Sequence, residues 1–341
     1  MTDMAKIMDA EKQGYDLRLD EVCRAIEDND YRTIMLQFPE GLKKLATLVK
    51  DIMVERTNAN VIISADSCFG ACDLPPTLDN LGIDLLVQFG HSEMPTLDSP
   101  LPTIFIEANS NLDVMSVVKK ALEHLNGSVG LITNAQHIHN LEEAKNFLEE
   151  NGFKVVVGKG SGRIAHDGQV LGCDLSSATS ISDSVECYLY IGSGNFHPLG
   201  VAIVTKKPVI IADPYLNEVR DIEETKNRLM RQRHGAIAKA KDVKSFGFIV
   251  GTKPGQTRLK LAFDLKKLAE KHEKKAYILV LNEFTPMNLK PFKIDAFVST
   301  ACPRIAIDDY MMYHVPILTP WEFRIVLGEE KWEDYRFDEF V

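Results

Sequence analysis

Hydrophobic and polar positions follow a pattern along this chain that occurs three times. Each copy opens with an apolar run, and these are TIMLQF from Thr33, VGLITN from Val129 and FGFIVG from Phe246. A segment with apolar residues at helical spacing follows each run, at 42–53, 140–152 and 258–275. Three further apolar runs complete each copy, at 60–66, 85–90 and 102–108, then 154–160, 188–194 and 207–213, then 276–282, 295–300 and 315–320.

Apolar runs bounded by Gly, Pro, Asp and Asn are typical of parallel strands that crossover helices cover on both faces. A helix-like segment introduces each copy, at 17–29, 112–126 and 216–242. The pattern predicts an α/β protein of three homologous small domains, each with a four-stranded, mainly parallel sheet, arranged around a central site. We place the domains of this triplicated unit at 1–110, 111–215 and 216–341. A single doubly wound sheet is the alternative, but it explains the recurring order and spacing less well.

Composition and charge narrow the function classes. The 341 residues are 45% hydrophobic and 26% charged, which is typical of a globular protein of two or three domains. No uncharged apolar run approaches the roughly 18 residues of a membrane helix, and the first 16 residues are polar and helical in pattern, unlike a signal peptide. We therefore expect a cytoplasmic protein. The net charge of −10 argues against an extensive phosphate-binding surface, so we expect no direct nucleic-acid binding.

Three of the six cysteines fall where ligands bind in open parallel sheets, just after the carboxyl ends of strands. Cys72 and Cys173 each follow the second strand of their copy and share the sequence Cys-Asp-Leu. Cys302 follows the third strand of the third copy. In a cytoplasmic protein, cysteines of this kind are more often metal ligands or catalytic groups than disulfide partners. The trio suits zinc with a fourth ligand, or a [4Fe-4S] cluster with one open iron.

The remaining cysteines carry less information. Cys68 has no counterpart in the second copy, and we interpret it as a spare thiol near the site. Cys23 lies in a helical pattern and Cys187 directly precedes a strand, so both are predicted to be structural. Pro75 stands where the third cysteine of C-x3-C-x2-C, a signature of iron–sulfur sites that cleave S-adenosylmethionine (SAM), would fall. The chain also lacks the C-x2-C pairs of closed zinc sites, so a site assembled from three domains is the better interpretation.

Six segments together resemble the diphthamide biosynthesis enzymes of archaea, the 2-(3-amino-3-carboxypropyl)histidine synthases. They are QFPEGL (37–42), SCFGACDL (67–74), GQVLGCDLSS (168–177), GSGNFHPLG (192–200), DPY (213–215) and STACPRIAIDD (299–309). The resemblance covers nearly the whole chain and depends on the combination of motifs. It implies a homodimer in which each chain holds a [4Fe-4S] cluster through three cysteines, one per domain, which map onto Cys72, Cys173 and Cys302.

The resemblance also implies a reaction. In this family a reduced cluster cleaves SAM between sulfur and Cγ of the methionine part, which yields methylthioadenosine and a 3-amino-3-carboxypropyl radical. The radical attacks C2 of the imidazole of one histidine in translation elongation factor 2, the first step of diphthamide biosynthesis. The partners implied are therefore elongation factor 2 and an electron donor. We expect no catalytic residue beyond the cluster.

Candidate SAM contacts come from strand-end loops. GSGNFHPLG is not a dinucleotide fingerprint, because His197 stands where the third glycine belongs, and a flexible turn is the alternative role. TKPGQTR (252–258) lacks the G-x4-G-K-[ST] pattern of a phosphate loop. Arg304 suits the SAM carboxylate, because its fork pairs bidentately, although a structural salt bridge is the competing role. The predicted contacts are Gln37, Glu40, Gly41, Gly192, Ser193, Gly194, His197, Lys253, Gln256 and Arg304.

Other functions compete with this interpretation. A quinolinate synthase-like [4Fe-4S] enzyme also has three pseudo-symmetric α/β domains around three cysteines, but it uses neither SAM nor a protein partner. A non-catalytic metal-binding partner subunit is expected to lack a ligand cysteine, whereas the trio is complete here. A zinc-binding regulatory protein is the third alternative. His137 and His139 are interpreted as polar loop residues, because no third metal ligand is obvious near them.

Overall fold

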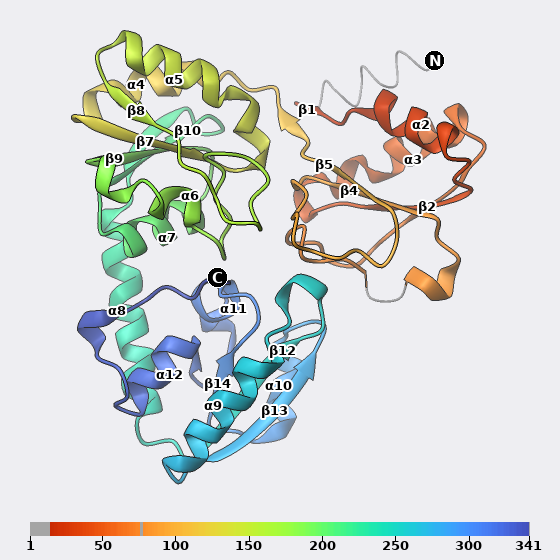
Figure 1. Cartoon of the computed structure of the whole chain (residues 1–341). Coiled ribbons are helices and arrows are strands. Elements are labelled where there is room, and N and C mark those ends of the chain that lie inside the picture. The colour runs from red at the N-terminus through yellow and green to blue at the C-terminus, as the bar shows by residue number, and fades with distance from the viewer. Residues whose placement is uncertain (1–13, 76–77, 341) are drawn as a thin grey trace.

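The computed structural model describes residues 14–75 and 78–340, so the helical prediction for the first residues lies outside the described part of the chain. Figure 1 shows three α/β units, drawn from red through green to blue, around a centre near which the C-terminal end lies. Each unit is built on one sheet. Within the described residues, no helix has the length and apolar character needed to cross a membrane.

The first unit takes its sheet from β2 (Thr33–Gln37), β3 (Asn60–Ile63), β4 (Leu85–Phe89) and β5 (Thr103–Ile106). Its helices are α2 (Leu19–Asp28), η1 (Glu40–Leu45), α3 (Ala46–Arg56) and η2 (Leu78–Leu81). A short antiparallel pair, β1 (Tyr15–Asp16) and β6 (Asn109–Ser110), lies where the chain leaves this unit.

The second unit takes its sheet from β7 (Ser128–Thr133), β8 (Lys154–Val156), β9 (Cys187–Ile191), β10 (Val209–Asp213) and β11 (Glu218–Asp221). Its helices are α4 (Met115–Ala121), η3 (Leu122–His124), η4 (Ala135–Asn140), α5 (Leu141–Glu150), α6 (Ser176–Thr179), η5 (Ser182–Ser184) and α7 (Phe196–Thr205).

The third unit takes its sheet from β12 (Ser245–Gly251), β13 (Lys275–Leu281), β14 (Ala296–Ser299) and β15 (Ile317–Leu318). Its longer helices are α8 (Glu223–Ala240), α9 (Leu259–Lys271) and α12 (Pro320–Val326). Its shorter ones are η6 (Pro254–Gln256), α10 (Pro286–Leu289), η7 (Lys290–Phe292), α11 (Arg304–Ile307), η8 (Tyr310–Met312) and η9 (Trp332–Asp334).

The three sheets share one strand order. The first runs β3-β2-β4-β5, the third β13-β12-β14-β15, and the second β8-β7-β9-β10 with β11 added at its edge. Every pairing in this shared core is parallel, as predicted. The same order of second, first, third and fourth strand supports the triplicated unit, which remains an inference from this likeness.

One predicted element is wrong at its start. The helix expected over 216–242 begins only at Glu223, and residues 218–221 form β11, antiparallel to β10. This edge strand was missed because it has the sequence Glu-Val-Arg-Asp, without an apolar run, and none of its residues is fully buried. Since β11 extends the second sheet, that unit continues past the predicted boundary at residue 215.

The cores occupy the spaces between sheets and helices. Cys23 and Cys187 are buried in two of these apolar clusters, which confirms their structural role. Within the third unit, a buried ion pair joins the long helix α8 to α12, with Nε of Arg233 2.7 Å from a carboxylate oxygen of Glu322. Loops that follow strands in all three units carry the residues described next.

Candidate functional site

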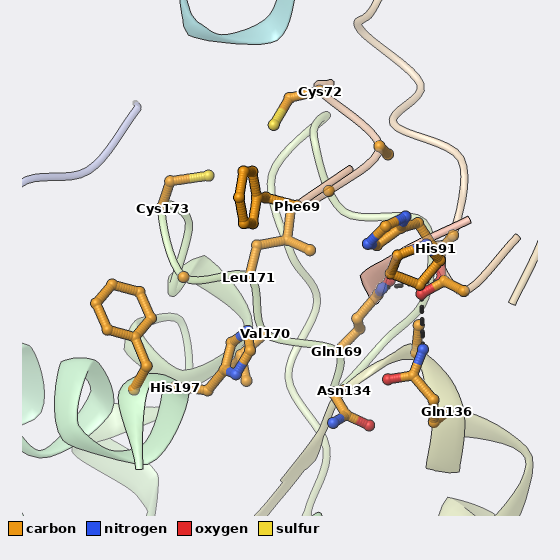
Figure 2. Close-up of a pocket in the computed structure, with 18 of the residues that line it drawn as sticks. Phe69, Cys72, His91, Asn134, Gln136, Gln169, Val170, Leu171, Cys173 and His197 are labelled. Atoms are coloured by element: carbon orange, nitrogen blue, oxygen red, sulfur yellow. Dashed lines mark hydrogen bonds between the residues drawn. The ribbon is translucent and has the colours of Figure 1, made fainter. Parts of the chain in front are cut away.

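A cavity of about 420 Å³ lies among loops of all three units, and Cys72, Cys173 and Cys302 all line it. Cys72 follows β3, Cys173 follows β8, and Cys302 follows β14. Figure 2 shows the first two of these thiols in the cavity. The structure therefore brings together the three cysteines that the strand-end positions predicted. Cys68 is buried but is not among the lining residues.

The loop of Cys72 is held by a turn of the third unit. The side-chain amide of Gln256 lies 3.4 Å from Sγ of Cys72, and the backbone N–H of Gly255 donates to the Cys72 carbonyl at 3.4 Å. A Cβ at residue 255 would lie 2.3 Å from Cβ of Cys72. Only glycine allows η6 to approach this closely, so the contact depends on that residue.

Cys173 is held by an arginine and by the end of the chain. Nη2 of Arg163 lies 3.9 Å from Sγ of Cys173 and donates to the carbonyl of Gly255 at 3.2 Å. The backbone N–H of Phe340 donates to the carbonyl of Cys173 at 2.8 Å. Residues of the second and third units therefore meet at this thiol.

The shared Cys-Asp-Leu sequence has a structural explanation. Asp73 accepts a bond from the N–H of Phe69 at 3.2 Å, and Asp174 accepts one from the N–H of Ser176 at 3.0 Å. The leucine that follows each aspartate is fully buried. In both copies the aspartate fixes the cysteine loop and the leucine anchors it to the core.

Burial raises the pKa of each of the three thiols, that of Cys173 to about 12. The second largest cause that raises the pKa of Cys173 and of Cys302 is the negative charge of the Cys72 thiolate. The Arg163 guanidinium opposes this rise at Cys72 and Cys173. Three adjacent thiolates therefore require a positive centre, which a bound metal supplies.

The donor set fits an iron–sulfur cluster better than zinc. Three thiolates on one zinc ion each bind at about 2.3 Å and so must converge on one point. Within 14–75 and 78–340, no three Cys, His, Asp or Glu side chains are grouped closely enough for one metal ion. A cluster instead spreads three cysteines over three irons and leaves the fourth iron open.

Five of the predicted SAM contacts line the cavity. They are Gly41, Ser193, His197, Gln256 and Arg304. Burial lowers the pKa of His197 to about 4, so its ring is neutral at pH 7. Nε of Arg304 pairs with Asp308 at 2.7 Å, and the guanidinium lies 5.1 Å from the centre of the Phe196 ring.

The other five predicted contacts are not among the lining residues. The side-chain amide of Gln37 donates to the carbonyl of Asp73, and Glu40 pairs with Lys43 at the surface. Lys253 is buried in an ion pair with Asp73. Gly192 and Gly194 have φ of 147° and 78°, which suits the tight turn after β9. The role of all five residues as SAM contacts stays a prediction.

Several lining residues were missed by sequence reasoning. Phe69 lines the cavity beside Cys72 and is 59% exposed. Its position as a large apolar residue among small ones in SCFGACDL could have marked it as a site residue. Burial lowers the pKa of His91 to about 4. Arg163 and Tyr215 also line the cavity. Nε of Arg163 is buried and has no partner among the described residues, so this arginine keeps a donor for a ligand.

The first and second units are joined beside the cavity. Glu107 of the first unit pairs with His166 of the second, and we call this the interdomain histidine–carboxylate pair. This hydrogen bond raises the pKa of His166. The side-chain amide of Gln136 donates to the carbonyl of Gly90 at 2.7 Å across the same junction. These contacts fix one wall of the cavity.

Comparison with known proteins identifies close relatives. The family model described as "Putative diphthamide synthesis protein" matches residues 38–336. The 2-(3-amino-3-carboxypropyl)histidine synthase of Pyrococcus horikoshii is 39% identical over 94% of this chain and 92% of its own length. The synthase of Methanocaldococcus jannaschii is 28% identical over 95% and 93%. The crystal structure of Dph2 from Pyrococcus horikoshii with a 4Fe-4S cluster superposes with a TM-score of 0.88, at 38% identity over 96% of this chain and 94% of that one.

Proposed function

This chain belongs to the diphthamide synthesis family, and from that premise we propose that it transfers the 3-amino-3-carboxypropyl group of SAM to a histidine of translation elongation factor 2. The observation that carries the proposal is the meeting of three thiols, one from each unit, at a single cavity. The family premise also favours this reaction over that of a quinolinate synthase. A non-catalytic subunit is less well supported, because the complete trio of cysteines is present.

Cys72, Cys173 and Cys302 are the proposed ligands of a [4Fe-4S] cluster. When bound, the cluster supplies an open iron for SAM and the single electron that breaks the bond between sulfur and Cγ. Arg163 and Gln256 lie beside the thiols, with N–H groups 3.9 Å from Sγ of Cys173 and 3.4 Å from Sγ of Cys72. N–H donors of this kind stabilise negative charge on the ligand sulfurs.

The cavity residues suit the charges of SAM. Arg304 follows Cys302 closely and lines the cavity, which supports the proposal that its guanidinium binds the substrate carboxylate beside its salt bridge with Asp308. His91 and His197 are neutral at pH 7, because burial lowers the pKa of each to about 4, and they therefore do not repel the sulfonium. Phe69 and Phe196 also line the cavity, and a protein cation already lies over each ring: Nζ of Lys253 is 5.3 Å from the centre of the first, and the Arg304 guanidinium is 5.1 Å from that of the second.

The apolar part of the wall excludes water from the reacting group. Val170 and Leu171 line the cavity together with the aromatic rings, and Figure 2 shows both on the side of Cys173. Exclusion of water would strengthen the electrostatic contacts by which the cavity residues orient SAM. Elongation factor 2 is the proposed protein partner, and a separate protein is the proposed electron donor. We propose that the enzyme is a homodimer and that the reaction takes place in the cytoplasm.

A transfer assay tests the proposal. Anaerobic protein is mixed with reductant, carboxyl-labelled SAM and archaeal elongation factor 2, and the wild type is compared with Cys72→Ala, Cys173→Ala and Cys302→Ala. Iron and sulfide are counted on the same samples. We expect each variant to lose both the cluster and the label transfer. A cluster without SAM binding or transfer supports the quinolinate-like alternative, and zinc or no metal overturns the cluster itself.

A further inference from the structure

Arg258, which lies between η6 and α9, binds the loop that carries Cys302. Its Nε donates to the carbonyl of Thr300 at 2.7 Å, and its Nη2 donates to the carbonyl of Ala301 at 3.2 Å. These carbonyls belong to the two residues immediately before Cys302. The guanidinium therefore fixes the backbone on the amino-terminal side of this thiol.

The same guanidinium binds the end of the chain. Nη1 and Nη2 lie 2.9 Å and 2.5 Å from the two carboxylate oxygens of Asp338, and Nη1 also donates to the carbonyl of Glu339 at 3.3 Å. The guanidinium carbon lies 4.0 Å from the centre of the Phe340 ring. The side chains of Arg258 and Asp338 are 16% and 8% exposed, so this bidentate pair is largely shielded from water.

The segment 338–340 passes this constraint to Cys173. The N–H of Phe340 donates to the Cys173 carbonyl at 2.8 Å, and the N–H of Leu175 donates to the Glu339 carboxylate at 2.9 Å. The Cys173 loop of the second unit is thus held at the cysteine carbonyl and at the N–H two residues further on, by residues that Arg258 orders.

The loop of Cys72 meets the same segment of chain. Gly255 and Gln256, which contact Cys72, come just before Arg258. The hydroxyl of Thr257 donates to the carbonyls of Gly251 and Lys253 at 2.8 Å and 3.1 Å, which closes this turn. Residues 255–258 therefore connect to all three cysteine loops.

We propose that Arg258 is a positioning residue that sets the spacing of the three site thiols by locking segment 338–340 onto the Cys173 loop. It is not among the residues that line the cavity, so it acts through the cysteine loops and not through contact with SAM. Arginine is required because its rigid planar guanidinium donates hydrogen bonds to three backbone carbonyls and one carboxylate at once. A lysine has one nitrogen and cannot reproduce this set. The role in cluster binding rests on the proposed function.

The test uses Arg258→Lys and Asp338→Asn, with Asp295→Ala as the matched control. Asp295 accepts bonds from the N–H groups of Lys244 and Ser245 and from the Ser245 hydroxyl, at the opposite ends of the strands of the third sheet. The control thus disturbs the third unit without touching a cysteine loop. Iron release to a chelator and the electron paramagnetic resonance signal of the reduced cluster are measured in the holoprotein. Hydrogen exchange of segments 171–177 and 335–340 is measured without the cluster.

We expect Arg258→Lys and Asp338→Asn to release iron about 10- to 100-fold faster than the wild type, as for other residues that orient metal ligands. We also expect an altered resonance signal and faster exchange in both segments, with the control unchanged in all three readouts. Wild-type exchange and iron release in both variants, or equal changes in Asp295→Ala, overturn the proposal. If the wild type binds no iron, the proposed function fails, and the exchange measurement still decides whether Arg258 locks the chain end.

Discussion

Lys253→Met tests how the first and third units are held together beside Cys72. Nζ of Lys253 lies 2.8 Å from a carboxylate oxygen of Asp73 and 3.0 Å from one of Glu283. The side chains of Lys253 and Asp73 are only 4% and 6% exposed, whereas that of Glu283 is 43% exposed. The substitution keeps the volume of the side chain but leaves the Asp73 carboxylate buried without its cation.

The expected loss follows from that burial. Removal of one partner of a buried ion pair costs about 3–5 kcal/mol, whereas an exposed pair contributes about 0–1 kcal/mol. The buried contact with Asp73 therefore dominates, and the exposed one with Glu283 adds little. Against a total stability of about 5–15 kcal/mol, the loss is large. The control is Lys43→Met, which removes a pair with the 59% exposed Glu40 and a hydrogen bond to the Ala65 carbonyl in the first unit and is expected to cost about 1–2 kcal/mol.

The assay is urea denaturation of the cluster-free protein followed by circular dichroism, with the SAM dissociation constant measured on the holoprotein. We expect Lys253→Met to lower the urea midpoint far more than Lys43→Met. A Lys253→Met midpoint equal to that of Lys43→Met refutes the reasoning. If SAM affinity then falls while stability is unchanged, Lys253 is a SAM contact, as its sequence position predicted.

Three further predictions follow from single contacts. Gly255→Ala places a Cβ 2.3 Å from Cβ of Cys72 and should lower the iron content, whereas Gly235→Ala, with open space around it in α8, should leave iron counts unchanged. Cys68→Ala should retain the cluster and Cys72→Ala should lose it, because Cys72 lines the cavity and Cys68 does not. If Cys68→Ala loses its iron and Cys72→Ala keeps it, Cys68 is the ligand. The pKa of His166 is raised above its unfolded value of about 6.5, so the interdomain histidine–carboxylate pair stabilises the protein below that pH. The gap in urea midpoint between the wild type and His166→Gln should shrink as the pH rises from about 6 to about 9; a gap that widens contradicts this assignment.

Hydrophobic periodicity predicted most of the fold, because buried parallel strands are continuous apolar runs. All twelve predicted strands are present in the structure. The polar edge strand β11 was missed, since none of its residues is fully buried and its sequence carries no apolar run. Domain 2 therefore has five strands where four were expected.

The thiols of the site were predictable from their position after strands, whereas their surroundings were not. Asp338 is 80 residues from Arg258 in sequence, and nothing in either local sequence marks their pairing. Lys253 was predicted as a SAM contact, but a buried carboxylate of another unit pairs with it. Contacts between units depend on how the three sheets are placed relative to one another, which no short motif specifies.

The most direct test of the central claim is the origin of the group transferred to elongation factor 2. Anaerobic, reduced protein is supplied in parallel with SAM labelled in the carboxyl carbon and SAM labelled in the sulfonium methyl group, and label on the acceptor histidine is counted. We predict that the carboxyl label is transferred and the methyl label is not, because the bond to Cγ breaks. Transfer of the methyl label, or of neither label by protein that contains the cluster, contradicts the proposed reaction.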